Sequence, residues 1–232
     1  MQDIGFDVIS DLHLSPNDSF NWENKATSLY CIVAGNISSD LRTIKQTLLH
    51  LTRCYQGVFY IPGMLEYQNC SNIPARIIEL IDLVSYIPNA CLLHQHVAVI
   101  DGVAIVGING WSAAGSSNSF EGVIEGIARK EDFLYLRNSL SKLQRHLDVK
   151  KIIIVSGAVP HPDLYFKENP DYIEDQVPLS DVLDIDTEKK TVTWVFGTYD
   201  KLVDTTIDGI NYINNPRPSK TPYWAKRLTI SV

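Results

Sequence analysis

Two side chains that can bind a metal ion stand two positions apart near the start of the chain. Asp11 and His13 follow the strand-like run Ile4–Ser10. In an extended segment, residues two positions apart point to the same side, so this carboxylate and imidazole would face one point. Such a pair can chelate a divalent cation. The alternative is that the two side chains pair with each other or with backbone amides.

Further chemically distinctive segments follow other strand-like runs. They are AGNI (Ala34–Ile37) after Leu29–Ala34, PGMLEY (Pro62–Tyr67) after Gly57–Ile61, VSGAVP (Val155–Pro160) at the end of Ile152–Val155, and WVFGTYD (Trp194–Asp200) at the end of Thr191–Phe196. In α/β folds, the loops at the carboxyl ends of strands build the functional site. We therefore expect these segments to meet at one edge of the molecule.

The elements that must position these loops alternate in the first half of the chain. Apolar stripes predict helices from Ser38 or Ser39 to about Thr52, near Pro74–Val84 and over Glu131–Leu147. Further strands are predicted at Cys91–Leu93, Val97–Ile100, Val103–Ile108, Lys201–Ile207, Ile210–Ile213 and Leu228–Val232, with hairpin turns at Asp101-Gly102 and Asp208-Gly209. A loop is expected at Ala113–Asn118, and His161–Asp186 is expected to be irregular. The pattern predicts one α/β domain over residues 1–232, a sheet-rich sandwich with helices outside.

Composition excludes several classes of protein. The 232 residues are 45% hydrophobic with a net charge of −7, which argues against a disordered chain and against a basic nucleic-acid-binding surface. No apolar run approaches the ~20 residues of a membrane span, and no basic segment followed by an apolar stretch suggests a leader. Four cysteines without a Cys-x-x-Cys pair suggest reduced thiols. We expect a cytoplasmic protein without membrane or nucleic-acid partners.

Taken in order, these segments resemble the motifs of the calcineurin-like metallophosphoesterase superfamily: Asp-x-His, Gly-Asp, Gly-Asn-His-Asp/Glu, a His near a Pro, and Gly-His-x-His. VAIVGINGW (Val103–Trp111) and NYINNPR (Asn211–Arg217) are similar to two further family segments, so the resemblance spans about residues 4 to 217. It implies a four-layer αββα sandwich of two mixed β-sheets with outer helices. It also implies a metal-dependent phosphoesterase ancestry.

The resemblance carries over one possible metal site. The family's first metal is held at positions that here are Asp11, His13, Asn36 and Asp200. Asn36 stands where the family has a carboxylate that bridges two metals, and an amide oxygen coordinates without charge. All four side chains can donate an electron pair, so the cofactor prediction is either no metal or one divalent cation, Mn²⁺, Mg²⁺, Zn²⁺ or Ca²⁺.

The positions of the second metal are degenerate. Beside Asn36 they are Met64, Gly157 and Thr198, which offer a soft thioether, no side chain and a weak neutral oxygen. The family's proton-donating His is replaced by Leu65, which cannot transfer a proton. A hydroxide nucleophile at neutral pH needs the charge of the metals, so we predict no catalytic residue here.

Two functions follow from these departures. The first is an inactive homologue that acts as a binding or regulatory module for a protein partner. In this function Met64, Leu65 and Phe196 would make the metal cleft of the family drier, and Glu66 would order its loop. The second is a residual single-metal hydrolase, in which His161 reaches the site and restores a ligand or an acid. Tyr223 and Trp224, in a Pro-rich tail, are candidate partner contacts.

Overall fold

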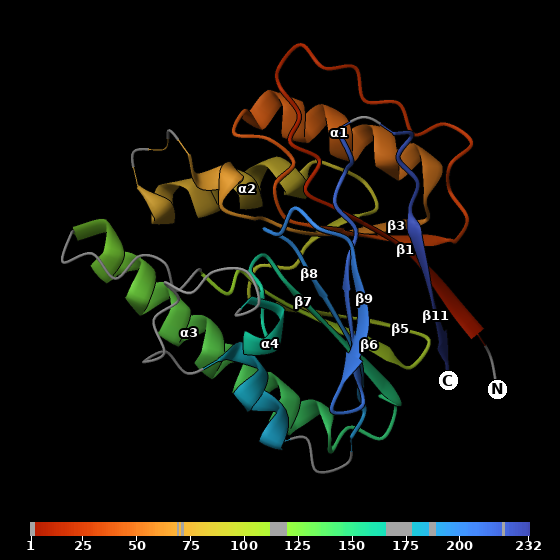
Figure 1. The fold of residues 1–232 in the computed structure, drawn as a ribbon, viewed down its shortest axis with the longest axis vertical. Helices are drawn as coiled ribbons and strands as arrows, with labels where there is room; N and C mark the ends of the chain where they lie inside the picture. Colours follow the sequence, from red (N-terminus) through yellow and green to blue (C-terminus); the bar gives the residue numbers. More distant parts are fainter. Residues whose placement is uncertain are drawn as a thin grey trace.

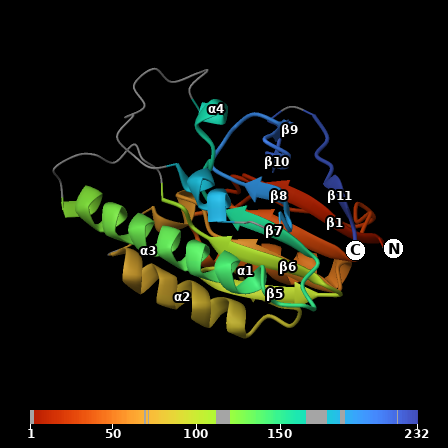
Figure 2. The ribbon, with the colours of Figure 1, turned by 90° about the horizontal axis from the view of Figure 1, so that it is seen from below.

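A computed structural model describes residues 3–68, 70, 72–111, 120–165, 178–185, 189–219 and 221–232. Two β-sheets face each other and helices cover both outer faces (Figures 1 and 2). One sheet has the order β11-β1-β2-β3-β4, formed by β1 (Asp3–Ser10), β2 (Tyr30–Ala34), β3 (Gly57–Ile61), β4 (Ala90–Leu92) and β11 (Lys226–Ser231). The other has the order β5-β6-β7-β8-β10-β9, formed by β5 (His96–Ile100), β6 (Val103–Ile108), β7 (Lys151–Ser156), β8 (Thr191–Phe196), β9 (Val203–Ile207) and β10 (Ile210–Asn214).

Both sheets are mixed, as predicted. β1 to β4 run parallel, as do β6, β7, β8 and β10, whereas β11, β5 and β9 pair antiparallel at the edges. Buried aliphatic side chains such as Ile32 and Val195 fill the space between the sheets. Because the central strands are covered on both faces, their sequences are continuous apolar runs.

Each outer face has its own helical layer. Helices α1 (Leu41–Cys54) and α2 (Ile73–Ser85) pack on the five-stranded sheet. Helix α3 (Phe120–Leu143) and the 3₁₀ segment η2 (Leu179–Ile185) pack on the six-stranded sheet. Two short elements, η1 (Leu65–Tyr67) and α4 (Pro162–Tyr165), lie in the connections. The four-layer αββα prediction is confirmed, and no helix in the described ranges is long and apolar enough to cross a membrane.

The helix boundaries differ from the predictions in instructive ways. Asp40, rather than a preceding serine, caps α1, because its carboxylate accepts a bond from the backbone N–H of Thr43. Helix α3 begins at Phe120 rather than at Glu131 and ends at Leu143 rather than at Leu147. The expected irregular segment contains α4 and η2, and the loop predicted at 113–118 lies outside the described residues.

The register brings the strand ends together. Ser10 of β1 pairs with Ala34 of β2, which in turn pairs with Ile61 at the end of β3. In the second sheet, Ser156 ends β7 opposite Phe196 at the end of β8. The loops that carry the predicted site residues therefore leave both sheets at one edge of the sandwich.

Candidate functional site

Loops from both sheets meet at this edge through a chain of hydrogen bonds. Asn36, after β2, donates from Nδ2 to Asp11 Oδ1, after β1, at 2.9 Å. The N–H of Leu65, beyond β3, donates to Asn36 Oδ1 at 2.8 Å. From the second sheet, the N–H of Thr198 donates to Asp11 Oδ1 at 2.8 Å, and its hydroxyl donates to the carbonyl of Gly157 at 2.5 Å. Asp11, Asn36, Gly157 and Thr198 thus lie together, and they bond to one another.

Asp11 is the centre of this network. The residue is fully buried, and its second oxygen, Oδ2, accepts a bond from Asn214 Nδ2 at 3.0 Å. Burial raises the pKa of this carboxyl above its ordinary value, while the hydrogen bonds from Asn214, Thr198 and Asn36 oppose that rise. Each carboxylate oxygen is already met by an N–H donor of the protein.

The amide of Asn36 uses both of its ends. Its oxygen accepts from Leu65 and its nitrogen donates to Asp11, with the Thr198 hydroxyl oxygen 3.4 Å away. A carboxylate at this position would accept from Leu65 but would have nothing to donate to Asp11. The asparagine is therefore matched to a site held together by hydrogen bonds.

The backbone is strained at this edge. Asp11, His13, Asn36 and Thr198 have positive φ angles of 48°, 46°, 48° and 58°. This conformation is uncommon outside glycine and is a clear outlier for a β-branched threonine. Such strain persists only where the surroundings over-determine it, and it clusters at functional sites. The strain marks this edge as the candidate site on grounds that do not depend on sequence resemblance.

Four glycines let the loops approach this closely. A Cβ added to Gly63 would lie 2.4 Å from Asn36 Oδ1, and one on Gly157 would lie 2.2 Å from the Pro62 carbonyl oxygen. A Cβ on Gly197 would lie 2.4 Å from the Ala34 carbonyl oxygen, and Gly35 packs between these glycines with φ +70°. The space that side-chain ligands would need is occupied by backbone.

His13 and Asp200 lie apart from the buried network. Their closest atoms, His13 Nε2 and Asp200 Oδ1, are 3.8 Å apart, and their side chains are 50% and 92% exposed. Asp11 pairs with amide donors and His13 with Asp200, so the structure does not join the four predicted ligands into one cluster. Among the residues described, no three His, Cys, Asp or Glu side chains are placed to hold a metal ion.

The arrangement of donors decides how a cation would fit. A cation at Asp11 would face the hydrogens of Asn36, Thr198 and Asn214, and it would have to break their bonds to reach the carboxylate oxygens. In this arrangement the residues do not fit a divalent metal. The single-metal site on Asp11, His13, Asn36 and Asp200 stays a prediction that this geometry disfavours.

Glu66 orders the loop after β3, as expected. Its buried carboxyl accepts from the N–H groups of Gly63 at 2.8 Å, Asn36 at 3.1 Å and Ile37 at 2.5 Å. Burial raises the pKa of Glu66 from an ordinary 4.5 to about 7, against the lowering effect of these backbone donors. The site therefore contains a structural carboxyl that ionises near neutral pH.

This pKa predicts a pH-dependent stability. A carboxyl whose folded pKa is raised favours the folded state at low pH, and that contribution is lost as pH rises from about 4.5 to about 7. We expect wild type to lose about 2 kcal/mol more than Glu66→Gln between about pH 5.5 and 8.5, because the glutamine does not ionise. Urea unfolding of both proteins at several pH values measures this difference, and parallel curves would contradict the assignment.

Three sequence expectations need correction. Phe196 packs in the core beneath α3 and does not line the cleft, which is polar and filled by hydrogen bonds rather than dry. Tyr223 is buried, with its hydroxyl donating to the Asn215 carbonyl at 2.5 Å, whereas Trp224 is 59% exposed. His161 lies against Tyr212, 5.4 Å between ring centroids, on the outer face of the six-stranded sheet. It is not among the residues bonded to Asp11.

Sequence reasoning missed Asn214, the residue that bonds to the second oxygen of Asp11. It is fully buried and also donates to the Phe196 carbonyl at 3.1 Å, so it ties β10 to β8 and β1. The available signal was a polar residue at the end of an apolar strand directly before Asn215-Pro216.

Comparison with known proteins supports the fold. No protein-family model matches the sequence. An uncharacterized protein, L509, of Acanthamoeba polyphaga mimivirus is 27% identical over 128 residues, covering 48% of this chain and 45% of that protein. The chain therefore matches less than half the length of that relative.

Two solved structures resemble the whole chain. The phosphopantetheinyl hydrolase PptH of Mycobacterium tuberculosis superposes with a TM-score of 0.68 at 16% identity, over 97% of this chain and 96% of that one. A putative 5'-nucleotidase of Staphylococcus aureus, solved with alpha-ketoglutarate, gives 0.56 at 14% identity, over 99% of this chain and 51% of that one. The chain has the metallophosphoesterase-type fold of these hydrolases.

Proposed function

We propose that this chain is a metallophosphoesterase homologue that does not hydrolyse phosphoesters and acts as a binding or regulatory module for a protein partner. One observation carries the proposal. The Asp11 carboxylate accepts bonds from three N–H donors, two of them from asparagine side chains, where a metalloenzyme needs free oxygens.

The groups that would move protons support the same function. The position of the family's acid is Leu65, whose backbone N–H holds Asn36 and whose aliphatic side chain cannot donate a proton. At Gly157 there is no room for an imidazole, because even a Cβ would meet the Pro62 oxygen at 2.2 Å. Metal activation of water and acid catalysis are therefore both unsupported.

Exposed groups around the network offer a surface for a partner. His13 and Asp200 are half or more exposed, and Leu202 is 67% exposed. Trp224 is 59% exposed. The side-chain amide of Asn215, the residue after Asn214, donates to the backbone carbonyl of Trp224 at 3.0 Å and so holds this segment beside the site. An exposed tryptophan beside a rigid polar site is typical of protein-binding surfaces.

Metal content and turnover test the proposal together. We expect protein dialysed against Mn²⁺ to retain less than stoichiometric metal and to turn over bis-p-nitrophenyl phosphate no faster than Asp11→Ala. Asp101→Asn, at an exposed turn remote from the site, controls for the loss of a carboxylate. Stoichiometric metal together with turnover that Asp11→Ala abolishes would overturn the proposal.

That outcome would favour the second candidate, a residual single-metal hydrolase. Its support is the approach of His13 Nε2 to Asp200 Oδ1 within 3.8 Å, since both groups are exposed and can donate electron pairs. If this candidate holds, His13→Ala and Asp200→Asn should each lower both metal content and turnover.

A further inference from the structure

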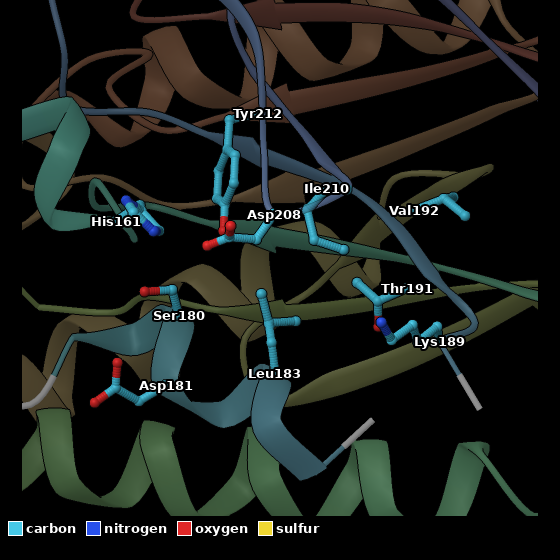
Figure 3. Close-up of a pocket in the computed structure, with 11 residues that line it drawn as sticks. His161, Ser180, Asp181, Leu183, Lys189, Thr191, Val192, Asp208, Ile210 and Tyr212 are labelled. Carbon is cyan, nitrogen blue, oxygen red and sulfur yellow. The ribbon is translucent and has the colours of Figure 1, made fainter. Parts of the chain in front are cut away.

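A cavity lies away from the strand-end site. It has a volume of about 510 Å³ and opens on the outer face of the six-stranded sheet, between η2 and the β9–β10 hairpin (Figure 3). Thr191 and Ile210, the first residues of β8 and β10, line it, so it sits toward the opposite ends of these strands from Asp11. Its volume falls in the range of small-molecule sites, about 300–1,000 Å³.

Tyr212 leaves an unpaired hydroxyl at this cavity. The residue is 1% exposed, and its ring stacks on Trp194 with 6.2 Å between centroids. Its side chain lines the cavity, and within the described part of the chain its hydroxyl makes no hydrogen bond. The buried hydroxyls of Tyr55, Tyr67 and Tyr223 all have partners. The Tyr212 hydroxyl faces the cavity and not the sealed core, so it can both donate and accept a hydrogen bond with a polar atom of a ligand.

The charges around the cavity indicate whether a ligand there should be positively or negatively charged. Among the described residues that line it, Asp181 and Asp208 contribute two carboxylates and Lys189 the single ammonium. His161 accepts a bond at Nδ1 from the backbone N–H of Asp163. Asp208 lies close enough to Tyr212 to add to the effect of burial in raising the pKa of that hydroxyl. This surplus of negative charge favours a cation and disfavours a phosphate group.

We infer that the cavity binds a small organic cation with a primary ammonium group on a short aliphatic stem, of the alkyl diamine class. The ammonium has three N–H donors, and the Tyr212 hydroxyl, the Asp208 carboxylate and the Ser180 hydroxyl are the acceptors that face the cavity (Figure 3). Leu183 and Ile210 supply the apolar wall for the stem. Asp181 at the rim accepts from the second ammonium group.

Calorimetric titration with 1,4-diaminobutane tests the inference on the intact chain. We expect binding that weakens about tenfold in Asp208→Asn and several-fold in Tyr212→Phe, since each removes one acceptor of a charged donor. Tyr212→Phe keeps the buried ring and breaks no internal hydrogen bond, so its thermal unfolding should match that of wild type. Asp101→Asn is the matched control, because Asp101 and Asp208 both precede glycine in hairpin turns with φ of 46° and 50°. Its affinity should be unchanged.

Three results would overturn the inference. One is the absence of binding up to about 10 mM diamine, weaker than any useful site of this size. Another is equal weakening by Asp101→Asn and Asp208→Asn, which would mean general attraction to an acidic protein. The third is equally tight binding of 1,4-butanediol, which would show that the cavity recognises hydroxyl groups instead of ammonium.

Discussion

Asn36→Asp should cost about 3–5 kcal/mol of unfolding free energy at neutral pH, although it introduces the carboxylate that the resemblance to metallophosphoesterases implies at this position. The contact from Asn36 Nδ2 to Asp11 Oδ1, 2.9 Å long, would become a contact between two buried carboxylates. Two like charges at this distance cannot both ionise, and the donor that Asp11 now uses would be gone. The expected loss is large because nothing compensates a second buried charge.

The loss should depend on pH in a defined direction. Repulsion raises the pKa of the carboxylate pair in the folded state, so the penalty is present at neutral pH and shrinks as the pair takes up one proton on acidification. Urea unfolding of wild type and variant at about pH 7.5 and pH 4.5 measures it. We expect less than half of the loss to remain at the lower pH.

Asn89→Asp provides the control for this substitution. Asn89 is exposed and has a φ of 63°, so it shares the left-handed backbone of Asn36 without a buried carboxylate beside it. Its replacement should change stability by no more than about 0.5 kcal/mol. If Asn36→Asp were as mild as this control, or if Mn²⁺ recovered the whole loss, the site would retain a metal-binding geometry and the hydrogen-bonded arrangement would be contradicted.

The strands were predictable because a buried strand shows itself in the sequence as a short apolar run. Runs such as Ile152–Val155 are apolar on both faces. The structure places this run in β7, Lys151–Ser156, and each residue from Ile152 to Val155 is buried. The Asp-Gly turns at Asp101 and Asp208 fixed both hairpins by their need for positive φ. The resemblance of the loop motifs then supplied the arrangement of layers that periodicity alone leaves open.

Helix α3 shows where local reasoning fails. The predicted helix began at Glu131 and so missed the first part of α3. That part contains Gly122 and Gly126, and glycine lowers intrinsic helix propensity. The predicted end included Leu147, which is 85% exposed beyond the helix. The spacing of apolar residues could not show that the apolar face of this helix has nothing to pack against after Leu143.

The sequence predicted that the candidate site residues would lie together, but not which residues would bond to them. The order of motifs brought Asp11, Asn36 and Thr198 to one edge, as expected. It could not show that Asn214, 203 positions from Asp11, would supply the bond that occupies the second carboxylate oxygen. Nor could it show that Gly157 is locked between loops, because the atoms around it come from Pro62 and Asn109. These contacts depend on three-dimensional register between two sheets.

Gly157→Ala should destabilise the protein by about 3 kcal/mol or more. The added Cβ would lie 2.2 Å from the Pro62 carbonyl oxygen and 3.0 Å from that of Asn109, and both obstacles are backbone atoms that no rotamer change can move. Gly157 has no positive φ, so the effect is steric. Urea unfolding measures the loss.

Gly126→Ala is the matched control, since it adds the same methyl group on α3 where no atom lies within 4 Å. It should stabilise by about 0.5–1 kcal/mol, because alanine loses less backbone entropy in a helix. Opposite signs for the two variants would show that the loops from the two sheets are closed against each other at Gly157. An unchanged stability in Gly157→Ala would mean instead that the loops can open, and that a larger side chain could be accommodated there. The steric test at one methyl group therefore bears directly on whether the strand-end site has room for a metal-ligating side chain.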